Sequence, residues 1–118
     1  MRQTTLSRRR ELYLEAIEVI EHSYSDENLS LGEVAREIAT SRRQLQRVFG
    51  ERDTSFRTEL QRVRMTRAAE LLRDGGAPVS AVARSVGYRQ PAQFSKAFRR
   101  HHGRPPSELR TTDEPVAA

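Results

Sequence analysis

The chain has 118 residues, a formal net charge of +5 and no cysteine. This length suits one domain, with room for two small linked cores. The lack of cysteine excludes disulfides, thiolate metal ligands and cysteine nucleophiles. No run approaches the ~18 apolar residues of a membrane span, so the sequence predicts a soluble, cytoplasmic protein.

The positive charge is concentrated in one part of the chain. Residues 29–110 carry 17 Lys+Arg against 8 Asp+Glu, whereas residues 1–28 carry 4 against 6 and residues 111–118 carry 0 against 2. A basic block of this kind is typical of polyanion binding, because each phosphate that it neutralises releases condensed counterions. The alternative is an ordinary solvated helical surface.

The first predicted element is an amphipathic helix over residues 7–22, preceded by a flexible N-terminus at residues 1–6. Its apolar residues recur at helical spacing. They are Leu12, Ala16, Ile17 and Ile20, with Tyr13, Leu14 and Val19 beside them. A polar connection at residues 25–28 follows.

A helix-turn-helix is predicted from Leu31 to Phe49, LGEVAREIATSRRQLQRVF. Ala35 is the small residue that two steeply crossing helices need where they approach. Four residues later the chain turns at Ala39, which costs up to roughly 1 kcal/mol relative to Gly if its φ is positive. Ser41 is the expected N-cap of the second helix.

A long helix is predicted next, running to about Arg73. Asp53, Thr54 and Ser55 are its cap candidates, and the sequence Asp74-Gly75-Gly76-Ala77-Pro78 ends it. Its predicted buried positions are Phe56, Leu60, Val63, Ala68, Leu71 and Leu72. An uninterrupted helix of ~18 residues spans ~27 Å, which can hold two recognition helices roughly one DNA turn of ~34 Å apart.

The segment VSAVARSVGYRQPAQFSKAF, residues 79–98, repeats the first helix-turn-helix about 48 residues later. Ala83 is again the small residue, Gly87 supplies the turn, and Pro91 suits a first helical position because it lacks an N–H. After Phe98, residues 107–110 can form a short helix, and a flexible tail is expected at residues 111–118. No segment alternates with the two-residue period of a strand. The predicted fold is therefore all-α, with about seven helices.

The second helix of each copy has an apolar face and a polar face. Leu45, Val48 and Phe49 face inward in the first copy, as do Phe94, Ala97 and Phe98 in the second. The outer face of the first, Arg43, Gln46 and Arg47, has side chains that read guanine and adenine edges. The outer face of the second is smaller and holds Ala92, Gln93, Ser95, Lys96 and Arg99.

From Leu31 to Arg110 the chain resembles the DNA-binding domain of the AraC/XylS family of bacterial transcription regulators. The most specific segments are GYRQPAQFSKAFRRHHGRPPSELR (residues 87–110), SRRQLQRVF (residues 41–49) and RMTRAAELL (residues 64–72). Two features depart from the family: Ala39 replaces the usual turn glycine, and the loop at residues 50–55 is one residue shorter. The resemblance fits a small single-domain member or an isolated C-terminal domain, located in the cytoplasm at the nucleoid.

The resemblance implies two recognition helices in adjacent major grooves of double-stranded DNA. The expected base-reading residues are Arg43, Gln46, Arg47, Ala92, Gln93 and Lys96, and the expected phosphate contacts are Ser41, Arg42, Arg89, Gln90, Ser95 and Arg99. The predicted domains are residues 7–53 and 75–110, one helix-turn-helix subdomain each, joined by a linker helix at residues 54–74. Since the two faces differ, a monomer is expected on an asymmetric site of roughly 20 bp.

The leading hypothesis is a sequence-specific regulator, more an activator than a repressor, which also contacts RNA polymerase. Two alternatives are a polymerase-binding module with weak DNA affinity and an architectural protein without sequence preference. No enzyme activity, cofactor or metal is expected. His22, His101 and His102 have no Cys or carboxylate at ligand spacing, and satisfied or solvated loop roles fit them better.

Overall fold

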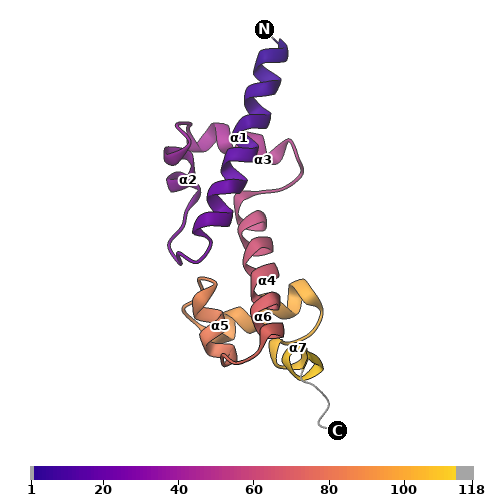
Figure 1. Cartoon of the computed structure of the whole chain (residues 1–118). Coiled ribbons are helices and arrows are strands. Elements are labelled where there is room, and N and C mark those ends of the chain that lie inside the picture. Colours follow the sequence, from indigo (N-terminus) through magenta and orange to yellow (C-terminus); the bar gives the residue numbers. More distant parts are fainter. Residues whose placement is uncertain (1, 114–118) are drawn as a thin grey trace. The chain divides into compact units, whose positions relative to one another are not determined.

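The structure is a computed structural model that describes residues 2–113, with side chains from 5 to 109. Its described part contains seven helices and no strand (Figure 1). They are α1 (Arg2–Ser23), α2 (Leu31–Glu37), α3 (Arg42–Gly50), α4 (Phe56–Asp74), α5 (Val79–Ser85), α6 (Pro91–His102) and α7 (Pro106–Asp113). The predicted all-α class and helix number are confirmed. Within the described residues, no helix is both long and apolar enough to cross a lipid bilayer.

The chain forms two compact units, and α4 contributes to both of them. Unit 1 consists of residues 1–24 and 28–60, and unit 2 of residues 25–27 and 61–118. In unit 1, α1, α2 and α3 pack against one another; in unit 2, α6 packs against α5 and α7. Each unit therefore holds one helix-turn-helix with its own supporting helix.

The core of unit 1 forms where α1 meets the first helix-turn-helix. Leu12, Ala16 and Ile20 are at most 1% exposed, which confirms the predicted inner face of α1. Leu14 is 55% exposed and lies on the outer face of that helix, whereas Ile17 is half-buried and lies at the edge of the buried face. The Tyr13 ring meets the buried Phe49 ring edge-on, with centroids 5.9 Å apart.

The two helix-turn-helix turns have the same backbone geometry. After α2, the Thr40 N–H donates to the Ala35 carbonyl and the Ala39 N–H to the Arg36 carbonyl. After α5, the Tyr88 N–H donates to the Ala83 carbonyl and the Gly87 N–H to the Arg84 carbonyl. Both pairs form the Schellman motif, in which the residue after the cap has positive φ. That φ is 58° at Ala39 and 96° at Gly87.

We expect Ala39→Gly to raise the free energy of unfolding by about 1 kcal/mol, because it removes the steric cost of a Cβ in the left-handed region. Urea denaturation followed by circular dichroism measures this change. The reverse substitution at the second turn, Gly87→Ala, is the control. It should lower the free energy of unfolding by about 1 kcal/mol or more, since Gly87 is buried and its backbone is in the left-handed region. Equal stability of Ala39→Gly and the parent chain would show that the first turn carries no strain.

The start of α4 differs in detail from the three proposed caps. Ser55 is the N-cap, since its Oγ accepts the Thr58 N–H at 3.1 Å. Thr54 instead donates its hydroxyl to a Glu59 carboxylate oxygen at 2.7 Å. Asp53 has φ of 56° and belongs to the turn after α3, where the Thr54 N–H donates to the Phe49 carbonyl. Only one of the three residues therefore caps α4.

The buried face of α4 was only partly predicted. Leu60, Ala68 and Leu72 are buried as expected, whereas Phe56, Val63 and Leu71 are half-buried. The prediction missed four buried residues, Met65, Ala69, Glu59 and Arg64. Two of these four are charged residues, and hydrophobic periodicity does not detect such positions.

The bounds of the first and last helices, and the end of α6, differ from the predictions. The helix α1 begins at Arg2, so residues 2–6 are helical rather than a separate N-terminal segment. The last helix, α7, begins at Pro106 and continues to Asp113, beyond the predicted residues 107–110. The remainder of the predicted tail, residues 114–118, lies outside the described residues. His101 and His102 are the last residues of α6 rather than loop residues, whereas the predicted alternative of a satisfied histidine holds for His102, whose Nε2 lies 3.0 Å from the Met65 carbonyl oxygen.

Candidate nucleic-acid interface

The helix α3 is fixed by its cap and by its apolar face. The Ser41 Oγ accepts the Gln44 N–H at 3.0 Å, which confirms the predicted N-cap. Leu45, Val48 and Phe49 are at most 2% exposed, as the spacing predicted. The opposite face of α3 must therefore point to solvent.

That outer face carries the three predicted base-reading side chains of the first copy. Arg43, Gln46 and Arg47 are all exposed and lie within two turns of one helix. Within the described part of the chain, none of these three side chains forms a hydrogen bond or an ion pair. Their donors and acceptors are therefore available to a ligand, and guanidinium and amide groups match the major-groove edges of guanine and adenine.

The helix α6 presents a smaller outer face of the same kind. Pro91 occupies its first position, and Phe94 and Phe98 are fully buried. Ala92, Gln93 and Lys96 are exposed, which confirms their predicted position on the outer face. Ala97, predicted inward, is half-buried. The second face thus combines one apolar, one amide and one ammonium side chain.

The six predicted phosphate contacts have different environments. Arg42, Gln90 and Arg99 are exposed, Ser95 is half-buried, Ser41 is occupied as a cap, and Arg89 is ion-paired. In the ion pair, the Arg89 Nε lies 2.6 Å from a Glu27 carboxylate oxygen. Arg89 would have to share its guanidinium between Glu27 and a phosphate, whereas Arg42 and Arg99 are open to solvent.

One arginine of the basic segment has a structural position instead. Arg64 is only 9% exposed and donates from Nη2 to the Asp26 carbonyl at 2.9 Å. Its guanidinium carbon lies 5.6 Å from the centre of the Tyr88 ring. Burial lowers the pKa of Arg64 from its ordinary value, and Tyr88 and Asp26 act in the opposite direction. Arg64 therefore does not contribute to the exposed positive surface.

Sequence reasoning also missed an arginine on the exposed side of unit 1. Arg9 of α1 lies beside α3, where it lines a groove together with Ser41, Arg43, Gln44 and Arg47. Its only sequence signal is the run Arg8-Arg9-Arg10, in a segment whose net charge is negative. The packing of α1 on α3 brings it to the basic face.

The histidines show no metal-binding arrangement. Within the described side chains, no cluster of three or more His, Asp or Glu residues could hold a metal ion. The His102 ring packs on Phe98, with centroids 4.3 Å apart, and its Nε2 lies 3.0 Å from the Met65 carbonyl oxygen. His102 therefore joins α6 to α4 inside unit 2.

Two helix-turn-helix motifs, each with a buried apolar face and an exposed polar second helix, define a DNA-binding class of domain. A family model described as a helix-turn-helix domain matches residues 34–112. The chain belongs to the AraC family of helix-turn-helix transcription regulators.

Solved structures share the fold over most of the chain. The C-terminal domain of AraT, a response regulator from Geobacillus stearothermophilus, is 33% identical with a TM-score of 0.81, covering 86% of this chain and 84% of that one. A transcriptional regulator with an AraC-type DNA-binding domain from Chromobacterium violaceum is 26% identical with a TM-score of 0.83, covering 92% and 96%.

An HTH-type transcriptional regulator of Mycobacterium tuberculosis is 42% identical over 76 residues. These residues make up 64% of this chain but only 22% of that protein. The chain therefore spans about a fifth of the length of this relative.

Proposed function

We propose that this AraC-family chain reads an asymmetric double-stranded DNA site with two recognition helices, α3 and α6, in adjacent major grooves. The observation that carries the proposal is the duplication: both helices are held by the same turn geometry and expose polar faces of different composition. Two unlike faces read two unlike half-sites, so one chain suffices for the whole site.

The length of α4 supports simultaneous binding by both helices. Its 19 residues rise by about 28 Å at 1.5 Å per residue, close to the ~34 Å of one DNA turn. Where the duplex does not present its grooves at the required angle, bending it costs of order 1 to 6 kcal/mol.

The side chains divide into two roles. Arg43, Gln46, Arg47, Ala92, Gln93 and Lys96 contact base edges, and Ser41, Arg42, Arg89, Gln90, Ser95 and Arg99 contact the DNA backbone. The first set carries the sequence preference and the second fixes register. Among the second set, the exposed Arg42 and Arg99 contribute most to the salt dependence of binding, because neither guanidinium has an intramolecular ion pair among the described residues.

We further propose that the chain activates transcription and contacts RNA polymerase when bound to DNA. Two other functions predict different results. A polymerase-binding module would bind a polymerase subunit without DNA, and an architectural protein would bind every duplex with similar affinity. Specific binding with a strong salt dependence distinguishes the proposed regulator from both.

Sedimentation of the chain with a duplex that it prefers tests the two-groove proposal. We expect one chain per duplex at saturation, because α3 and α6 occupy both half-sites. A matched duplex with one half-site scrambled should bind the same single chain more weakly. Two chains per intact duplex would contradict the proposal.

A further inference from the structure

Three arginines from two helices line one groove beside α3. Arg9 of α1 and Arg43 and Arg47 of α3 line one groove, together with Ser41 and Gln44. We call this the Arg9 groove. Among the described side chains, no acidic residue lines it, although Glu51 is ion-paired with Arg9. The groove therefore presents several hydrogen-bond donors and a concentrated positive charge to one point in solvent.

Arg9 is held in place by its own contacts. Its Nη1 lies 2.7 Å from a carboxylate oxygen of Glu51, and the two side chains are 32% and 42% exposed. The helix that carries Arg9 packs against α3. An exposed ion pair of this kind contributes little stability, but it holds the guanidinium beside the C-terminal end of α3, where Glu51 is the cap residue.

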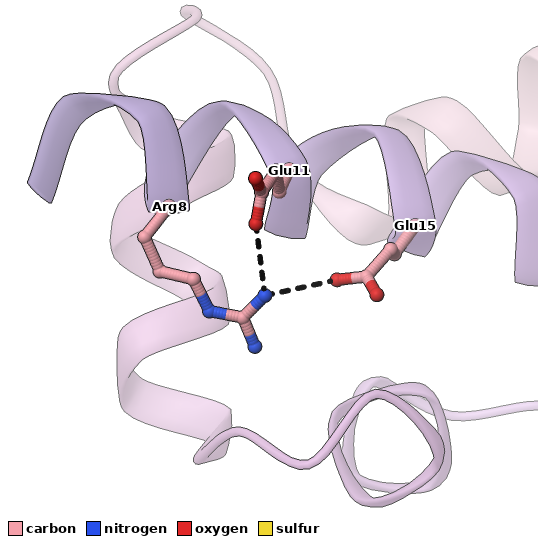
Figure 2. Close-up of polar contacts among 3 residues, drawn as sticks. All are labelled: Arg8, Glu11 and Glu15. Carbon is pink, nitrogen blue, oxygen red and sulfur yellow. Dashed lines mark hydrogen bonds and ion pairs between the residues drawn. The ribbon is translucent and has the colours of Figure 1, made fainter. Parts of the chain in front are cut away.

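Arg8, one residue earlier, has a different environment. Figure 2 shows its guanidinium between the carboxylates of Glu11 and Glu15 on the same helix. The distances from Arg8 Nη1 are 3.3 Å and 3.5 Å. Arg8 does not line the Arg9 groove. The two neighbouring arginines thus provide a matched pair, equal in charge and different in position.

We propose that Arg9 binds one phosphate of the DNA backbone at the edge of the Arg9 groove, a contact from α1 outside the helix-turn-helix, while Arg43 and Arg47 keep their base-reading role. This inference rests on the proposed function, since it places the phosphate next to the base-reading face of α3. Guanidinium groups bind phosphate oxygens through paired N–H donors, and such contacts fix the register of a recognition helix. Arg9 then positions α3 in the groove without reading sequence.

The test compares Arg9→Ala with Arg8→Ala on two duplexes, one selected by the parent chain and one with the same bases scrambled. We expect Arg9→Ala to weaken binding to both duplexes by about three- to tenfold and to lower the slope of log affinity against log salt by about 0.9. Arg8→Ala should leave affinity and slope close to those of the parent chain. Equal behaviour of the two variants would overturn the inference.

A Glu51→Gln variant separates phosphate binding from a structural role of the ion pair. If Arg9 contacts phosphate, this variant should bind DNA as well as the parent chain or about twofold tighter, because a negative charge near the backbone is gone. If the ion pair only supports the fold, Glu51→Gln should weaken binding as much as Arg9→Ala does. That result would overturn the inference. Thermal denaturation checks that all variants are folded.

The two proposals fail in different ways. Loss of discrimination between the selected and scrambled duplexes by the parent chain would overturn the proposed function. The reduced salt slope of Arg9→Ala is measurable on either duplex, so it does not depend on that discrimination. A parent chain that discriminates, with an unchanged slope in Arg9→Ala, would leave the proposed function intact and remove only the Arg9 contact.

Discussion

Phe98→Ala is expected to lower the free energy of unfolding by about 3–5 kcal/mol, the usual cost of truncating a buried aromatic residue. The Phe98 side chain is fully buried, and its ring centroid lies 5.7 Å from that of Phe94 and 4.3 Å from that of His102. A small domain has a total stability of about 5–15 kcal/mol. The substitution therefore removes a large fraction of what stabilises unit 2.

Urea denaturation followed by circular dichroism measures this effect. Arg100→Ala is the matched control on the same helix, since Arg100 is exposed, and it should change stability by about 0.5 kcal/mol or less. Because α6 depends on Phe98 for its position, Phe98→Ala should also weaken contacts with the half-site that α6 reads. A loss below about 1 kcal/mol would mean that the core of unit 2 does not depend on this ring.

Arg47→Ala is expected to weaken binding to the preferred site by about 1–3 kcal/mol and to relax base preference at one position. Arg47 is exposed on the outer face of α3, and it forms no ion pair within the described residues. A bidentate contact with guanine explains both the size and the position of the expected change. Quantitative binding to a panel of single-base variants of the site measures them.

Arg99→Ala provides the comparison for this experiment. Arg99 is exposed on α6 and is assigned to the backbone, so its removal should weaken binding to all sequences alike and flatten the salt slope. Base preference should stay unchanged. If Arg47→Ala lowered affinity equally for every duplex, Arg47 would be a phosphate contact and the assignment of the α3 face would be wrong.

Local signals in the sequence were sufficient to predict most of the fold. Ser41 caps α3, Pro91 begins α6, and Gly87 has the positive φ that its turn requires. These features depend on single residues and their immediate neighbours. Ala39 also has positive φ, although this conformation has a steric cost for alanine. The turn forms the same two hydrogen bonds as the turn at Gly87.

The ends of the first and last helices were harder to place. Residues 2–6 add one apolar side chain, Leu6, which is 58% exposed. A single apolar residue gives no helical periodicity, so the sequence offers no signal for a helix over this segment. The last helix likewise continues past Arg110, since no Gly or Pro interrupts the sequence before Pro115.

Long-range packing explains the other differences. Arg64 belongs to the basic segment, but its guanidinium is bound to the Asp26 carbonyl, 38 residues away. Arg9 belongs to a segment of negative net charge, but it lies beside α3 and pairs with Glu51, 42 residues away. Charge counted along the sequence does not show the position of either residue, because neither contact follows from local sequence.

The decisive experiment for two-groove, sequence-specific binding is selection from a randomised duplex library at about 150 mM salt, followed by sequencing of the duplexes that the purified chain retains. We expect enrichment of one asymmetric motif with two unlike boxes about one helical turn apart. Enrichment of a palindrome would contradict this expectation by showing that two chains read identical half-sites, and absence of enrichment would contradict sequence-specific binding itself.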